Sequence, residues 1–250
     1  MGMRKIRLTI SYDGTEFWGW QRQKRGRTVQ GVIEHALQRM HQADVSVVGA
    51  GRTDSGVHAT GQVAHFLSDI ESIPDWRFRD ALNYYLPLDV RIVASEVADT
   101  EFDARRSACA RLYCYNLYCG RVVLPEYRRY CMHLRRTPDL ERLNEIVSTL
   151  RGVHDFSSFC VRRDGHQNRT RRVHFCRFQI CGQFLVLRIC ANAFLWKMVR
   201  NIVGTALEIE SQHAGKGEIE RILHSRDRAL AGATAPASGL FLRRVFYGGE

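Results

Sequence analysis

Long apolar runs are missing from this chain of 250 residues, because no stretch of about 18 consecutive apolar residues occurs anywhere. A helix needs such a stretch to cross a lipid bilayer, so the sequence predicts no membrane span. The first residues, Met1 to Ile6, also lack the apolar run of a signal peptide and lead at once into an alternating pattern. We therefore expect a cytoplasmic protein.

Cysteine is absent from the first 108 residues, and none of the eight cysteines forms a C-x-x-C pair. This spacing disfavours a zinc site. An even number of cysteines leaves disulfides open, but free buried thiols are favoured in a cytosolic chain of this size. The histidines at 58, 65, 154 and 166 have no cysteine or carboxylate at ligand spacing, so metal binding is the less favoured interpretation.

Lysine is scarce: the 37 basic residues comprise four Lys and 33 Arg, against 26 acidic residues. The resulting net charge of +11 and pI of 9.6 favour a polyanionic partner, whose phosphates such a surface would neutralise. Arginine suits phosphates and base edges because its planar guanidinium bonds bidentately and stacks. A genome-wide codon bias is the alternative cause of the Arg to Lys ratio, but it does not explain the excess of positive charge.

Apolar periodicity predicts six elements in the first half of the chain. Residues 6–12 alternate as a strand, and Thr28 precedes a helix with one buried face. Short strands at 46–48 and 62–67, a helix at 76–85 and a strand at 90–97 follow. The order of strand, helix, strand, strand, helix, strand is that of a ferredoxin-like fold.

The second half is predicted to be a longer copy. Strands are expected at 111–119, 127–134, 171–180, 184–192 and 240–247, with one helix capped by Thr137 and another after Asn192. We predict an α+β protein of two ferredoxin-like halves, 1–107 and 108–250. Their antiparallel sheets would join side by side, with helices on one face and a basic RNA-binding cleft on the other.

The glycine-rich segment 49–61, which begins G-A-G-R-T-D-S-G-V-H-A, is the most unusual stretch in the chain. A dinucleotide-binding turn would need a third glycine where Asp54 stands and a helix afterwards, but Gly61 and a strand follow. In an extended backbone Arg52 and Asp54 would share one face, and a carboxylate beside a cation stays ionised, as a nucleophile or base requires. The alternative is that Asp54 caps a turn.

Tyr113, Arg200 and two basic stretches are further candidates for contacts with RNA. Tyr113 could stack on a base or pack in the core. Arg200 falls with Lys197, Asn201 and Gly204 opposite the apolar stripe of its helix, so it either faces solvent or points at a cleft. Phosphate contacts are favoured for six arginines, 162, 163, 169, 171, 172 and 177; the second stretch holds Arg121, 128, 129, 135 and 136.

Together these segments resemble the tRNA pseudouridine synthase A family. The matching pieces span nearly the whole chain in family order: residues 12–15, 19–23, 28–31, 49–63, 81–87, 102–105, 113–115, 152–156, 191–195, 198–201 and 234–240. The resemblance implies that Asp54 is the essential aspartate and Arg52 helps flip the target nucleotide. It further implies that Tyr113 stacks on the flipped uracil, Arg200 pairs with the aspartate and Leu240 packs against the base.

The same resemblance implies a homodimer without metal or organic cofactor, which converts uridine to pseudouridine at positions 38, 39 and 40 of the tRNA anticodon stem-loop. One carboxylate suffices for this isomerisation, because uracil leaves the sugar as a delocalised anion and rejoins it through C5. The carboxylate either attacks the sugar or removes a sugar proton. Extruding the nucleotide from a stem costs a few kcal/mol, which Arg52 and Tyr113 would offset.

Two other functions use the same basic surface. A non-catalytic RNA-binding protein would need no ionisable group at position 54. A metal-dependent nuclease would need clustered carboxylates, and Asp13, Asp54 and Asp103 have no recognisable spacing. The segment around Asp54 distinguishes the predicted isomerase from both.

Overall fold

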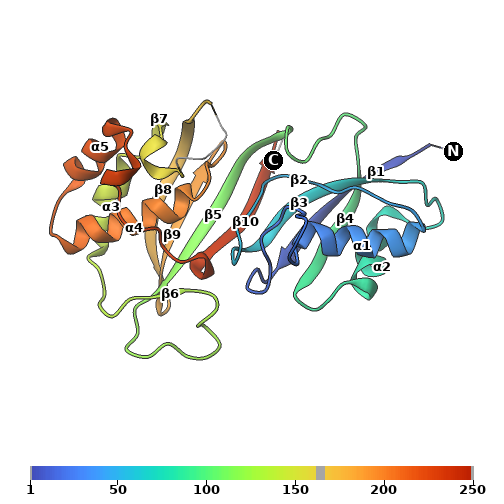
Figure 1. Ribbon diagram of the computed structural model, residues 1–250, viewed down its shortest axis with the longest axis horizontal. Helices are drawn as coiled ribbons and strands as arrows, with labels where there is room; N and C mark the ends of the chain where they lie inside the picture. Colours follow the sequence, from blue (N-terminus) through green and yellow to red (C-terminus); the bar gives the residue numbers. More distant parts are fainter. Residues whose placement is uncertain (1, 162–166, 249–250) are drawn as a thin grey trace. The chain divides into compact units, whose positions relative to one another are not determined.

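The computed structural model describes residues 2–161 and 167–248, and it divides into two compact units. Unit 1 comprises Met1–Cys109 with Phe241–Glu250, and unit 2 comprises Ala110–Leu240. The elements of each unit are labelled in Figure 1. The predicted α+β class is confirmed, with mostly antiparallel strand pairs in both units. The predicted division into halves at residue 107 stays a prediction.

Unit 1 has the predicted order of elements: β1 (Arg4–Tyr12), α1 (Val29–His41), β2 (Val48–Gly49), β3 (His58–Ser68), α2 (Phe78–Tyr85) and β4 (Val90–Ala98). β1 pairs antiparallel with both β3 and β4, and β2 pairs with β3. The helices α1 and α2 lie over this sheet (Figure 1). The final strand, β10 (Leu240–Tyr247), pairs parallel with β3 through Phe241 and Leu242.

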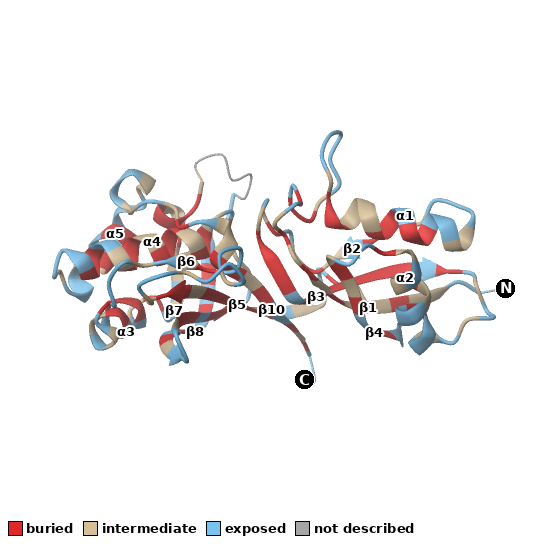
Figure 2. Cartoon of the chain, turned by 90° about the horizontal axis from the view of Figure 1, so that it is seen from below, coloured by how far each residue is buried: buried red, intermediate tan, exposed pale blue. Residues whose placement is uncertain are grey.

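The core of unit 1 follows from its sequence pattern. Ile6, Leu8, Ile10 and Tyr12 of β1 are all buried, as the alternation predicts. Helix α1 starts where expected, because the Thr28 hydroxyl accepts the N–H of Gly31 at 3.3 Å. Its apolar face buries Ile33 and Leu37. Buried residues, red in Figure 2, run along the strands of this unit.

Unit 2 contains β5 (Ala108–Tyr118) from Ala110 onward, β6 (Met132–His133), α3 (Leu140–Ser148), β7 (Gly152–Asp155), β8 (Thr170–Cys181), β9 (Phe184–Ala191), α4 (Met198–Ser211) and α5 (Lys216–Ser225). β9 pairs antiparallel with β5 and β8, and β8 pairs with β7. The three helices contact one another, and α3 packs on β8. Together these contacts enclose a second core that includes Leu143, Ile146 and Ile202.

Three details of unit 2 differ from the prediction. Residues 127–134, predicted as one strand, form turns and only the two-residue strand β6. Apolar and polar residues do not alternate regularly in this segment. Asp139, not Thr137, caps α3, because its carboxylate accepts the N–H groups of Glu141 and Arg142. β7 and α5 had not been predicted, because four residues and a half-polar helix give a weak periodic signal.

Candidate active site

Asp54 lies in the loop of residues 50–57 that connects β2 to β3. Thr53 is buried, Asp54 is half-buried and Arg52 is exposed. Arg52 and Asp54 thus lie in the same loop, and the prediction that their side chains share one face stays a prediction. A half-buried carboxylate is shielded on one side by protein and accessible to a substrate on the other.

This loop is fixed by hydrogen bonds to the segment that follows β1. The N–H of Trp20 donates to the carbonyl oxygen of Thr53 at 3.0 Å, and the N–H of Gly56 donates to that of Phe17 at 3.3 Å. Within the loop, the N–H of Val57 donates to the carbonyl oxygen of Asp54 at 3.1 Å. Because backbone groups on both sides of Asp54 are bonded, its main chain is held in place before substrate arrives.

Side chains beneath the loop add to this support. The hydroxyl groups of Tyr12 and Thr53 are hydrogen-bonded at 2.8 Å, and the Gln62 amide donates to the carbonyl oxygen of Gly51 at 2.8 Å. Burial raises the pKa of Tyr12 above its ordinary range, although its hydrogen bonds act in the opposite direction. Tyr12 therefore stays a neutral phenol whose role is to position Thr53.

Two glycines before α1 allow the close approach of these segments. Gly19 has φ of +95°, and a Cβ there would lie 2.6 Å from the carbonyl oxygen of Thr53. A Cβ at Gly14 would lie 2.0 Å from the carbonyl oxygen of Val57. No L side chain fits at either position without moving backbone, so both glycines are required by contact with the loop of Asp54.

His58, the first residue of β3, holds the C-terminal end of the Asp54 loop in place. Its Nδ1 accepts the N–H of Gly14 at 3.0 Å and lies 3.2 Å from Oδ1 of Asp13. Its ring is buried and stacks on Phe241 of β10, with 4.6 Å between ring centroids. In the sequence His58 is one of several scattered histidines, yet in the structure its ring connects the segments on either side of β3.

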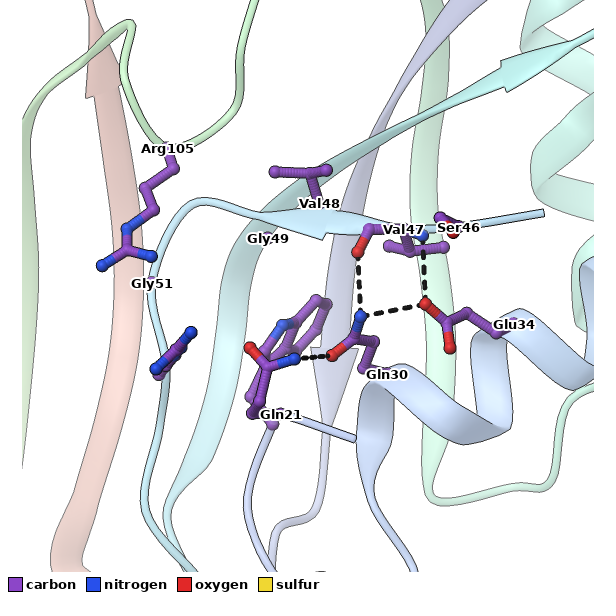
Figure 3. A pocket seen from close by; sticks show the side chains of 11 residues that line it. Gln21, Gln30, Glu34, Ser46, Val47, Val48, Gly49, Gly51 and Arg105 are labelled. Atoms are coloured by element: carbon purple, nitrogen blue, oxygen red, sulfur yellow. Dashed lines mark hydrogen bonds between the residues drawn. The ribbon is translucent and has the colours of Figure 1, made fainter. Parts of the chain in front are cut away.

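A cavity of about 300 Å³ opens beside Arg52 within unit 1. Its lining includes Trp20, Gln21, Gln30, Glu34, Gly51, Arg52 and Arg105. Figure 3 shows the Arg105 side chain pointing toward Gly51. It also shows the hydrogen bonds that the Gln21 amide donates to Gln30 and the Gln30 amide donates to the Glu34 carboxylate. Two guanidinium groups on this cavity make its rim suited to a phosphate. Arg105 was not singled out as a site residue from the sequence, although it falls in a segment that carries the family resemblance.

Tyr113, on β5, is 8% exposed. Its ring meets that of Phe194 edge to face, with 4.9 Å between centroids and an interplanar angle of 77°. This contact holds the plane of the Tyr113 ring, and stacking on a base stays a prediction. Tyr115, two residues along β5, is fully buried and donates its hydroxyl to the carbonyl oxygen of Pro236 at 2.8 Å.

Arg200 lies in the first turn of α4, half-buried. Its Nε donates to the carbonyl oxygen of Ala235 at 2.7 Å, and the N–H of Ala235 donates back to the carbonyl oxygen of Arg200 at 3.1 Å. The prediction that Asn201 shares this polar face is wrong, because Asn201 is fully buried. Its amide donates to Phe159 and accepts from Thr234, so a polar residue type did not indicate an exposed position.

Leu240 is the first residue of β10 and is 6% exposed. Gly239 precedes it, and a Cβ there would lie 2.7 Å from the ring of Tyr115. The contacts of Tyr115 and Arg200 with residues 235–239 thus position Leu240. In unit 2, Tyr113, Arg200 and Leu240 belong to segments tied to one another by these bonds.

Only some arginines of the two basic stretches are exposed at the surface. Arg162 and Arg163 lie outside the described residues. Arg171 is 8% exposed and donates to the carbonyl oxygens of Asn168 and Thr170, so it supports its own turn. The exposed members of the first cluster are Arg172 and Arg177. In the second stretch, Arg136 is bound to Glu210 by two hydrogen bonds.

Comparison with known proteins identifies the family. The family described as tRNA pseudouridine synthase matches residues 8–105 and 146–248. The tRNA pseudouridine synthase A of Treponema denticola is 43% identical over 249 residues, which cover 98% of this chain and 93% of the relative. That of Bacillus licheniformis is 41% identical over 245 residues, covering 97% and 99%.

This chain belongs to the tRNA pseudouridine synthase family. As a member it is an isomerase that converts uridine to pseudouridine in tRNA. Among solved structures, the archaeal box H/ACA sRNP Nop10–Cbf5 complex matches 96% of this chain and 48% of that chain at 12% identity, with a TM-score of 0.37. The assignment rests on the sequence relatives.

The structure also describes the thiols, the possible metal ligands and the helix lengths of this pseudouridine synthase. All eight cysteines lie in the described part of the chain, and all are free thiols there. Across residues 2–161 and 167–248, no three His, Cys, Asp or Glu side chains are grouped so that they could hold a metal ion. No helix in those residues is both long enough and apolar enough to span a membrane.

Proposed function

We propose that this enzyme isomerises uridines 38, 39 and 40 in the anticodon stem-loop of tRNA, with Asp54 as the essential carboxylate. The observation that carries the proposal is the half-buried position of Asp54 in a loop bonded on both sides, next to the exposed Arg52. A nucleophile or base must be accessible on one face and fixed on the other. Asp54 meets both requirements.

The proposed reaction divides the work among five side chains. Arg52 stabilises the extruded nucleotide through its phosphate, which offsets part of the cost of flipping. Tyr113 stacks on the flipped uracil and Leu240 packs against the base. Arg200 pairs with Asp54 and keeps it ionised. The support for these roles is the exposure of Arg52 and the bonds that fix Tyr113 and Arg200 within their own segments.

In this scheme the N-glycosidic bond breaks first, and uracil leaves as an anion without an acid to protonate it. The uracil turns within the site and forms a carbon–carbon bond from C5 to C1′ of the same sugar. The proton on C5 is then lost, and N1 gains one. Asp54 takes part in one of two ways. It attacks C1′ as the bond to N1 breaks and is displaced when C5 bonds to C1′, or it removes the proton from C2′ as the bond to N1 breaks and returns it after C5 has added to C1′. Both alternatives need Asp54 ionised.

The enzyme is proposed to act as a homodimer in the cytoplasm, where unmodified tRNA is available. The position of modification is tested with purified enzyme and unmodified tRNA transcripts that carry uridine at 38, 39, 40 and elsewhere. Pseudouridine is mapped chemically at each site. Modification confined to 38–40 is the expected result, and modification of a stem outside the anticodon arm would overturn the proposed site. Sedimentation at micromolar concentration tests the dimer.

A further inference from the structure

Trp18 is exposed in a segment whose other aromatic residues are buried. Its exposed fraction is 58%, whereas those of Phe17 and Trp20 are 1% and 2%. Leaving a large indole in solvent forgoes the stabilisation that its burial would give. Exposed aromatic rings of this kind are common where a protein contacts a partner.

The position of Trp18 is set by the loop that carries Asp54. Phe17, just before it, accepts hydrogen bonds at its carbonyl oxygen from the N–H of Gly56 and, at 3.2 Å, from the hydroxyl of Ser55. Trp20, two residues after it, donates to Thr53. Trp18 is therefore carried by a segment bonded to the loop of Asp54 on both sides of the indole.

The ring itself is braced on one side by the backbone of Gly26. A Cβ at Gly26 would lie 2.4 Å from Cδ2 of the Trp18 indole. The N–H of Trp18 donates to the carbonyl oxygen of Arg27 at 2.8 Å, and the amide of Gln23 donates to the carbonyl oxygen of Trp18 at 2.9 Å. These contacts hold the backbone of Trp18 and cover one side of its ring, which restricts the indole and lowers the entropy lost when a ligand stacks on it.

Residues 22–27, which include the Gly26 that lies against the ring, carry positive charge and contain no acid. Arg27 is occupied with Asp89, to which it donates at 2.9 Å, and Arg22 is paired with Glu34 at 3.2 Å. Lys24 and Arg25 are exposed at the tip of the loop. Proteins that hold single-stranded nucleic acid combine exposed aromatic rings with exposed cations, and this segment carries both.

We propose that Trp18 stacks on an unpaired base of the tRNA that neighbours the target uridine, while Lys24 and Arg25 contact the adjoining phosphates. This inference rests on the proposed function of the Asp54 loop. Stacking on an indole is tolerant of base identity because each base has a π face. Trp18 would therefore hold the strand beside the flipped nucleotide without selecting a sequence.

The test uses the full-length enzyme with Asp54→Asn, which is expected to bind tRNA without turnover. Tryptophan fluorescence is followed as unmodified tRNA is added, with Trp18→Phe or Trp76→Phe as the second change. Trp76 is 53% exposed, close to the 58% of Trp18, and Arg77 lies 4.9 Å from its ring, so it is an equally exposed indole beside a cation and serves as the control. The expected result is that quenching by tRNA is largely lost with Trp18→Phe and kept with Trp76→Phe.

Kinetics provide the second measurement. Trp18→Ala with Asp54 intact is expected to lower kcat/KM by about 5- to 150-fold, mostly through KM, while Trp76→Ala changes it less than about twofold. Gly26→Ala, which displaces the indole without removing it, should reproduce part of the loss. Circular dichroism melting checks that each variant is folded, which is expected because Trp18 is exposed.

Equal quenching in the Trp18→Phe and Trp76→Phe proteins, or equal kcat/KM for Trp18→Ala and Trp76→Ala, would overturn the inference. Failure of the proposed function has a different signature. In that case Asp54→Asn would stay active or pseudouridine would form outside positions 38–40, whatever the fluorescence of Trp18 shows.

Discussion

The backbone N–H of Trp20 donates to the carbonyl oxygen of Thr53 over 3.0 Å, one residue before Asp54. This bond joins a segment that follows β1 to a loop more than thirty residues later in the chain. It explains why the family resemblance includes residues 12–23 as well as the glycine-rich loop: the first segment is the support on which the loop of Asp54 rests.

Gly19→Ala should damage this support. The Cβ would lie 2.6 Å from the carbonyl oxygen of Thr53, and φ of +95° is unfavourable for alanine. We expect a loss of about 1–3 kcal/mol in the free energy of unfolding and a fall in activity. Gly51→Ala, in the loop of Asp54, is the control, because no atom lies within 4 Å of the added Cβ. Urea unfolding of both variants checks this, and equal stability would contradict the proposed contact.

Acidification should weaken the attachment of the segment that carries Arg105. Nδ1 of His65 accepts the N–H of Ala104 at 3.1 Å, and burial lowers the pKa of His65, with Asp103 opposing the shift. Because the folded-state pKa is lowered, this contribution is present above the pKa of the unfolded chain and is lost as pH falls through the folded value. Urea unfolding between pH 7.5 and 5 should show the loss.

The variant His65→Asn separates this effect from general acid sensitivity. Its side-chain oxygen can accept the N–H of Ala104 and does not titrate. The variant should therefore be less sensitive to pH between 7 and 5 than the unmodified protein. The same slope in both proteins would show that His65 does not cause it.

Asn201→Ala should destabilise unit 2. The fully buried amide donates to the carbonyl oxygen of Phe159 at 2.8 Å and accepts from Thr234 at 2.7 Å and Arg228 at 3.2 Å. Removing it leaves buried polar partners unsatisfied, at a cost of about 1–3 kcal/mol. Glu218→Ala breaks only an exposed pair with Arg221 and should change stability by less than about 0.5 kcal/mol. Thermal unfolding compares the two.

Binding of tRNA should depend steeply on salt. Exposed arginines such as Arg52, Arg172 and Arg177 can each displace counterions from phosphates. If six or more phosphates are neutralised, affinity should fall by about a thousandfold between 50 and 200 mM salt. Filter binding across that range measures the slope. A flat response would mean that the excess of positive charge is not the footprint of RNA.

Local patterns predicted most of the elements that position the site. The alternation in β1 and the Thr28 cap are properties of neighbouring residues, so a sequence can show them. Asn201 could not be predicted as buried, because its partners Phe159 and Thr234 lie over thirty residues away on either side. His58 was overlooked for the same reason: its stacking on Phe241 is a contact across 183 positions of the chain.

The residues of the candidate site also differ in whether neighbouring residues in the sequence could reveal them. Asp54 and Arg52 share a loop with a distinctive sequence, whereas Arg105 reaches the cavity beside Arg52 from a separate segment. Trp18 carries no local signal either, since an aromatic residue between Phe17 and Trp20 looks like part of the core. Only the burial of its neighbours and its own exposure distinguish it.

The ionised carboxylate of Asp54 is proposed to perform the isomerisation. Asp54→Asn removes the charge at nearly constant volume, so the loop and the tRNA-binding surface should be preserved. The deciding measurement is pseudouridine formation on unmodified tRNA by this variant, together with its affinity for the same tRNA. We predict a loss of activity of at least about a thousandfold, with affinity unchanged within a few-fold. Full activity in the Asp54→Asn enzyme would contradict the account.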